Sequence, residues 1–156
     1  MRKKVVKIRP ITPDLVYSSK LITKMINYII KDGKRHLASK IFYNAMDIVK
    51  EKTNQDPILV FNQAVKNAMP QLQLKSRRMG GATYQVPIEV LPRRQIIYAL
   101  KWIQQEAEKR KTHHTMEENL ASEIIDAYHN SGGAVKRKRD VHRRAEENKA
   151  FAHFNW

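Results

Sequence analysis

The spacing of apolar residues changes near residue 70 and changes back near residue 92, and this interruption constrains the fold more than any other feature. Before Pro70 and after residue 92, apolar side chains recur every three or four residues, which is typical of amphipathic helices. Between residues 71 and 90 they alternate with polar side chains on both sides of Gly80-Gly81, which indicates two strands joined by a tight turn. We therefore predict a mainly α fold of about six helices with one protruding, two-stranded antiparallel β-ribbon.

Apolar stripes place the helices, and two of their N-termini carry explicit start signals. The expected ranges are 18–31, 35–52, 57–69, 93–110, 116–129 and 134–149. Asp56 can cap the third helix, with Pro57 at its first position, and Thr115 with Glu118 forms a capping box for the fifth. The apolar stripe expected for the second helix consists of Leu37, Ile41, Ala45 and Ile48.

The chain reads as one domain, residues 1–156, because no linker, repeat or low-complexity tract divides it. Its hydrophobic content of 42% is enough for a core. The ribbon spans 71–90, and its apolar positions lie near its base, so the tip residues 77–82 are expected to be free of packing. A tail follows at 150–156.

Residues 1–17 are predicted to form an extended basic arm, because Pro10 and Pro13 discourage a helix. No acid precedes Asp14. The basic residues of this arm are Arg2, Lys3, Lys4, Lys7 and Arg9.

Positive charge dominates the composition, with thirty Lys and Arg against fifteen Asp and Glu and a net charge of +15. Repulsion on this scale opposes compaction unless a polyanion neutralises it, so we expect a nucleic-acid partner. Outside the arm the cations gather at Lys34, Arg35, Lys75, Arg77, Arg78, Arg93, Arg94, Lys136, Arg137, Lys138, Arg139, Arg143 and Arg144. A single cluster is more often a solvated face, but six cations in nine positions near the C-terminus favour bound phosphates.

The ribbon tip is the sharper candidate site. Lys75, Arg77 and Arg78 approach the turn at Gly80 and Gly81, whose backbone N–H groups can come close to phosphate. Arginine can bind phosphate bidentately or stack on a base, and Tyr84 offers a second stacking surface. An ordinary hairpin with exposed arginines explains the same residues equally well.

Other chemistry has little support in the sequence. The adjacent His113 and His114 point apart on a regular element, and no nucleotide loop or catalytic arrangement is present, so we expect no metal, cofactor, small-molecule substrate or enzyme activity. The chain has no cysteine and no apolar run long enough to cross a membrane. The aromatics Phe151, Phe154 and Trp156 either stack on RNA bases or dock on the protein itself, and we favour docking.

Three stretches carry a resemblance to a known family. They are Asp32-Gly33-Lys34-Arg35 with Ile41-Phe42 and Ala45, the ribbon from Lys75 to Pro87, and Asp140-Val141-His142-Arg143 with residues 148–154. Together they resemble the family of small-subunit ribosomal protein seven, in its bacterial form. The likeness covers essentially the whole chain, and the ribbon motif is highly specific.

This resemblance implies a structural constituent of the small ribosomal subunit that binds the 3′ major domain of its RNA and nucleates assembly of the head. It implies a place at the subunit interface, near the exit-site tRNA and the mRNA path, with small-subunit ribosomal proteins nine and eleven as neighbours. It implies a cytoplasmic ribosome, although the sequence leaves open an organelle-encoded origin. Some members of the family repress their own operon, and the sequence leaves this open too.

Two other classes of function fit less of the chain. A helix-turn-helix DNA repressor would use Lys34 and Arg35 between two helices, but it leaves the ribbon and the arm unexplained. A membrane-surface protein would need a broad apolar face beside its cations, and the helix at 134–149 has too little apolar surface.

Overall fold

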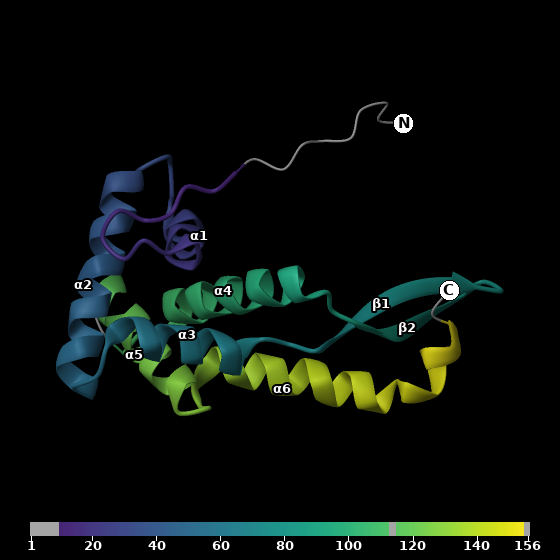
Figure 1. Ribbon diagram of the computed structural model, residues 1–156. Coiled ribbons are helices and arrows are strands. Elements are labelled where there is room, and N and C mark those ends of the chain that lie inside the picture. The colour runs from purple at the N-terminus through teal and green to yellow at the C-terminus, as the bar shows by residue number, and fades with distance from the viewer. Residues whose placement is uncertain (1–9, 113–114, 155–156) are drawn as a thin grey trace.

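Six α-helices, a 3-10 helix and one two-stranded sheet make up residues 10–112 and 115–154, the part of the chain that the computed structural model describes (Figure 1). The elements are α1 (Lys20–Ile29), α2 (Arg35–Thr53), α3 (Pro57–Ala68), β1 (Leu72–Met79), β2 (Ala82–Glu89), α4 (Pro92–Lys109), α5 (Met116–Tyr128), α6 (Gly132–Glu147) and η1 (Lys149–Phe154). The predicted fold, mainly α with one ribbon, is confirmed.

The helical core is centred on α5, which packs against α2, α3, α4 and α6. Ile124 of α5 is fully buried, as are Phe42 of α2 and Phe61 of α3, whose rings meet edge to face with centroids 5.6 Å apart. Burying a side chain of this size stabilises a fold by about 1.5–3 kcal/mol. These contacts give the molecule one continuous core at the end away from the ribbon (Figure 1).

Both predicted helix starts are confirmed. The Asp56 carboxylate accepts the N–H of Ile58 at 2.9 Å, with Pro57 as the first residue of α3. The Thr115 hydroxyl accepts the N–H of Glu118 at 3.3 Å and caps α5. Each bond satisfies a backbone donor that the first turn of a helix would otherwise leave without a partner.

The predicted apolar stripe of α2 is confirmed at Ala45, but its centre is displaced by one residue. Ile41 and Ile48 are half-buried against the core, and Leu37 is 52% exposed. The buried side chains of α2 are those of Ala38, Phe42, Ala45, Met46 and Val49. Both sets have helical spacing, so periodicity alone does not choose between two adjacent arcs of one helix. The large ring of Phe42 determines which arc faces the core, because burying it removes more apolar area from water than burying the neighbouring Ile41 side chain would.

The described end of the predicted arm, residues 10–17, is attached to the helices. Asp14 accepts the N–H groups of Val16 and Tyr17, and the hydroxyl of Tyr43 donates to Asp14 Oδ1 at 2.6 Å. Burial, together with the bond to Asp14, raises the pKa of Tyr43 to about 12. The prediction of an extended arm is therefore wrong for residues 15–17, which form a turn.

The ribbon is the only sheet within the described residues, and its two strands pair in register from Leu72 opposite Glu89 to Met79 opposite Ala82. Gly80 and Gly81 form the two-residue turn, with φ angles of 55° and 86°. Two consecutive positive φ angles are typical of a type I′ hairpin turn, which glycine adopts without strain.

A glycine pair lets α6 begin two residues earlier than predicted and approach α4 and α5 closely. Gly132 has a φ of +83°, and a Cβ atom there would lie 2.9 Å from Cβ of Asp126. A Cβ atom on Gly133 would lie 2.9 Å from Cβ of Glu106 in α4. Side chains at these positions would push α6 away from the core.

We expect Gly133→Ala to lower the free energy of unfolding by about 1–3 kcal/mol, because overpacking at Glu106 outweighs the preference of roughly 1 kcal/mol for alanine inside a helix. Thermal melting measures the change. Lys136→Ala, at an exposed position of the same helix, is the control and should melt like the wild type. A Gly133→Ala variant as stable as the wild type would show that the approach of α6 to α4 is looser than described.

Candidate nucleic-acid interface

The predicted RNA-binding residues lie on separate elements. The ribbon, the start of α4 and α6 share one end of the molecule, whereas α2, which begins with Arg35, lies at the other (Figure 1). Lys34 and Arg35 are both exposed, after a turn in which Asp32 and Gly33 have φ angles of 53° and 73°. The arm residues Arg2, Lys3, Lys4, Lys7 and Arg9 lie outside the described residues.

The alternation of side chains along β1 and β2 sorts the ribbon into two faces. We call one the covered face; it consists of Lys75, Arg77, Met79, Ala82, Tyr84 and Val86. We call the other the open face; it consists of Ser76, Arg78, Thr83 and Gln85. All four open-face residues are exposed. On the covered face Arg77, Met79, Tyr84 and Val86 are buried or half-buried, whereas Lys75 and Ala82 are exposed. The two arginines that the sequence groups together therefore point to opposite sides.

Aromatic residues of η1 lie against the covered face. The ring centroid of Tyr84 is 5.2 Å from that of Phe151 and 5.4 Å from that of Phe154. Docking of the tail on the protein itself is thus confirmed for these two phenylalanines, while Trp156 lies outside the described residues. The expected stacking surface on Tyr84 is occupied by the chain's own side chains.

The expectation that the ribbon tip is free of packing is wrong for Arg77 and Met79, whereas the other tip residues are exposed. Arg77 and Met79 are half-buried, and together with Arg78 and Phe154 they line a recess of about 120 Å³. The apolar ring of Phe154 packs beside the turn of the ribbon. Strand alternation does not reveal this contact, because it joins residues that are far apart in the sequence.

Several cations of α6 bind other parts of the protein. The Arg137 guanidinium donates to Gln105 at 2.7 Å and lies 5.6 Å from the ring centroid of Trp102. Lys138 donates to the carbonyl of Asn67 at 2.8 Å. Such contacts fix α6 against α3 and α4, so part of the basic cluster is structural.

Other cations have no such role. Around the ribbon, within the described part of the chain, six of the predicted RNA-binding cations are exposed and have no side-chain hydrogen bond or ion pair: Lys75, Arg78, Arg93, Arg94, Lys136 and Arg144. Arg139 and Arg143 are also exposed, although Arg139 donates to the carbonyl of Asn130 and Arg143 forms ion pairs with Asp140 and Glu147. Because these cations are exposed around the ribbon, this end of the molecule can bind phosphate groups.

The base of the ribbon is tied to α6 through His142. The N–H of Gln71, just before β1, donates to His142 Nε2 at 3.0 Å. This bond needs a neutral ring nitrogen as acceptor. Burial lowers the pKa of His142, the charge of Lys138 lowers it further, and Glu146 acts in the opposite direction.

We expect this histidine to make stability depend on pH. The unfolded chain takes up the proton near the ordinary pKa of about 6.5, whereas the folded chain takes it up at lower pH. The stabilising contribution is therefore present above about pH 6.5 and is lost as the pH falls through the folded pKa.

His142→Gln is the test, because its amide oxygen can accept the same bond without titrating. Denaturant unfolding should show the wild type losing more stability than the variant between about pH 7 and about pH 5. Equal losses in the two proteins would mean that His142 does not join α6 to the ribbon as described.

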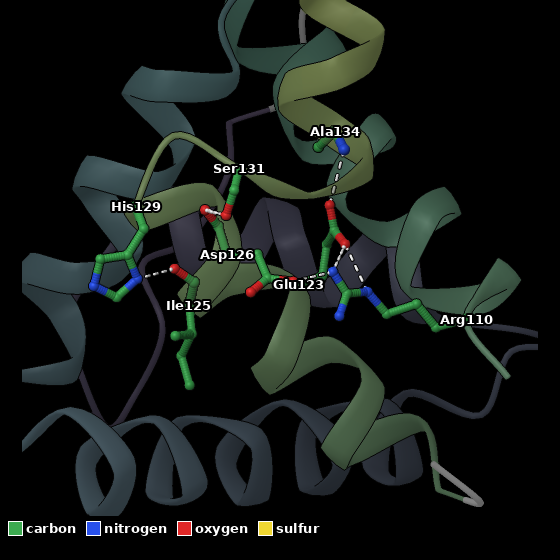
Figure 2. A network of polar contacts seen from close by, with 7 residues as sticks. All are labelled: Arg110, Glu123, Ile125, Asp126, His129, Ser131 and Ala134. Carbon is green, nitrogen blue, oxygen red and sulfur yellow. Dashed lines mark hydrogen bonds and ion pairs between the residues drawn. The ribbon is translucent and has the colours of Figure 1, made fainter. Parts of the chain in front are cut away.

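A buried ion pair fixes the start of α6. Glu123 of α5 is 0% exposed and receives the Arg110 guanidinium on one oxygen, at 2.6 Å from Nη2 and 2.8 Å from Nε. Its other oxygen accepts the N–H of Ala134 in the first turn of α6, at 2.8 Å (Figure 2). Burial raises the pKa of Glu123, although Ala134 and Arg110 both oppose the rise.

The turn between α5 and α6 adds to this network. Arg110 also binds the carboxylate of Asp126, and the Ser131 hydroxyl donates to the Asp126 carbonyl at 2.9 Å (Figure 2). His129 Nδ1 lies 2.9 Å from the carbonyl of Ile125. These bonds satisfy the last carbonyls of α5 and set the direction in which α6 leaves the core.

Sequence reasoning missed Glu123, although a signal for it exists. Glu123 stands between Leu120, Ile124 and Ala127 on the buried face of α5. A carboxylate inside an apolar stripe is rarely left without a partner. The buried carboxylate predicts a cation nearby, but it does not identify Arg110, at the end of α4, as that cation.

The described residues hold no cluster of three His, Cys, Asp or Glu side chains suited to a metal ion. None of the described helices is long and apolar enough to span a membrane.

Comparisons with known proteins identify the family of the chain. Residues 1–149 match the family described as ribosomal protein S7p/S5e. The small ribosomal subunit protein uS7 of Caldicellulosiruptor bescii is 52% identical over 155 residues, which cover 99% of both chains. The proteins of the same description from Natranaerobius thermophilus and Dictyoglomus turgidum are 53% and 55% identical over 148 residues, which cover 95% of this chain and 94% of theirs. The resemblance seen in the motifs is confirmed, and the chain belongs to the ribosomal protein S7p/S5e family, a family of structural proteins rather than enzymes.

Proposed function

We propose that this chain, a structural constituent of the small ribosomal subunit, binds the 3′ major domain of small-subunit ribosomal RNA and nucleates assembly of the head. The observation that carries the proposal is the group of exposed cations without intramolecular partners around the ribbon: Lys75, Arg78, Arg93, Arg94, Lys136 and Arg144. Phosphates that these cations neutralise would release counterions, which favours binding.

The shape of this end of the molecule suits folded RNA. The ribbon projects from the helices and α6 runs beside it, so the cations are spread over a long surface rather than along one helix (Figure 1). A DNA repressor would instead present a single helix to a regular groove. Irregular RNA, with junctions and splayed strands, fits a projecting ribbon better.

The proposal includes a location. The chain lies in the cytoplasm, on the ribosome, at the subunit interface near the exit-site tRNA and the mRNA path, with small-subunit ribosomal proteins nine and eleven as neighbours. The family resemblance supports this location, and the projecting ribbon supplies an element able to reach such a path. Repression of its own messenger would use the same cations and needs no second site.

We expect Lys136→Ala with Arg144→Ala to weaken binding to 3′ major-domain RNA and to reduce the slope of log affinity against log salt by about two, or about one for each phosphate contact. Filter binding between about 50 and about 200 mM salt measures both quantities. Thermal melting should not change, since neither side chain has a polar partner in the described residues.

Lys50→Ala with Lys52→Ala is the charge-matched control, because both residues are exposed in the last turn of α2, outside the proposed clusters. The control should keep most of the affinity. If it weakened binding as much as the α6 variant, the interface would be diffuse electrostatics and the proposed site would be wrong.

A further inference from the structure

The ribbon has an internal support that matters for its function. A two-stranded hairpin is at best marginally stable in water unless something packs on it. Here α6 lies along β1, and η1 lies against β2. The ribbon is therefore folded together with α6 and with the tail that follows it.

The support consists largely of three aromatic rings. Phe151 and Phe154 are stacked, with an interplanar angle of 12°, and both contact Tyr84. Val86, two residues along the same face, is 0% exposed. The contact extends to the tip, where Phe154 and Met79 line the same small recess. An aromatic pair of this kind contributes beyond its buried area.

The open face is different in chemistry. Its side chains are those of Ser76, Arg78, Thr83 and Gln85, all exposed, and Gln85 Nε2 donates to the Ser76 hydroxyl at 3.1 Å. Hydroxyl, amide and guanidinium groups are those that bind phosphates, 2′-hydroxyls and base edges. The tail covers the aromatic part of one face, so the ribbon offers a ligand chiefly its open face, together with the exposed Lys75 of the covered face.

We propose that η1 clamps the ribbon and reserves its open face for RNA. Phe151 and Phe154 are positioning residues: they act through Tyr84 and do not contact RNA. Arg78, Thr83 and Gln85 make the contacts. This inference rests on the proposed function and refines it, because it separates Arg78 from Arg77 and removes Tyr84 from the RNA-binding surface.

The clamp is tested with Phe151→Ala combined with Phe154→Ala in the full chain. We expect affinity for 3′ major-domain RNA to fall about tenfold, since the loss of aromatic packing leaves the ribbon partly unfolded. Hydrogen exchange of the β1 and β2 amides should become faster in the free protein, while exchange in α3 and α5 stays the same. The salt slope should not change, because no phosphate contact is lost.

The role of the open face in RNA binding is tested with Thr83→Ala combined with Gln85→Ala. This variant should bind the RNA about tenfold more weakly, with exchange of the ribbon amides unchanged. Tyr84→Phe keeps the ring and removes the hydroxyl, so it should behave like the wild type. Leu59→Ala removes an apolar side chain that is 66% exposed on α3, and it controls for the loss of surface apolar area.

Several results would overturn the inference. Unchanged ribbon exchange in the double phenylalanine variant would show that there is no clamp, and weaker binding with unchanged exchange would show that the rings contact RNA directly. Tighter binding would make the tail a cover that competes with RNA. A loss of affinity in Tyr84→Phe would place RNA on the covered face.

The clamp and the proposed function can fail separately. Hydrogen exchange of the ribbon amides measures the effect of η1 in the absence of RNA. It therefore tests the clamp even if the wild type shows no preference for 3′ major-domain RNA. Such a lack of preference would overturn both the proposed function and the role of the open face in RNA binding. Faster exchange in the double phenylalanine variant would still establish that η1 supports the ribbon.

Discussion

The pairing of Glu123 with Arg110 is the interaction on which the rest of the structure depends. A carboxylate that is 0% exposed is costly unless its oxygens are bound, and here Arg110 and the N–H of Ala134 bind both. One partner ends α4 and the other begins α6, so a single buried side chain joins three helices. The glycines before Ala134 allow this approach, since a Cβ atom at either would meet α4 or α5.

The direction of α6 in turn determines the ribbon end of the molecule. His142 of α6 binds the backbone before β1, and η1, which follows α6, packs on β2. The same helix carries cations with two distinct uses. Arg137 and Lys138 are bound within the protein, whereas Lys136 and Arg144 are exposed without a partner in the described residues. A chain with a net charge of +15 can fold in this way because some of its cations form stabilising contacts within the protein. The others are exposed and available to bind phosphate.

Local patterns predicted much of this structure, and contacts between distant residues account for what they missed. Asp56, Thr115 and the pair Gly80-Gly81 mark helix caps and a turn, which depend on neighbouring residues only, and all three were predicted correctly. The two strands of the ribbon were also predicted correctly, from the alternation of apolar and polar side chains.

The errors have a common physical cause. The stripe of α2 was misplaced because spacing does not say which of two adjacent arcs meets the core. Tyr84 looked like a surface for RNA bases, but Phe151 and Phe154 occupy it from the other end of the sequence. Glu123 and Arg110 meet through the packing of α4 against α5, which no local pattern encodes. Residues of the basic arm before Pro10 lie outside the described residues, and their RNA binding stays a prediction.

Chemical footprinting of the purified chain on naked small-subunit ribosomal RNA tests the central claim most directly. We expect protection of a compact set of nucleotides confined to the 3′ major domain, with part of that set lost in the variant Thr83→Ala with Gln85→Ala. Protection scattered across the domains of the RNA, or centred on another domain, would contradict it.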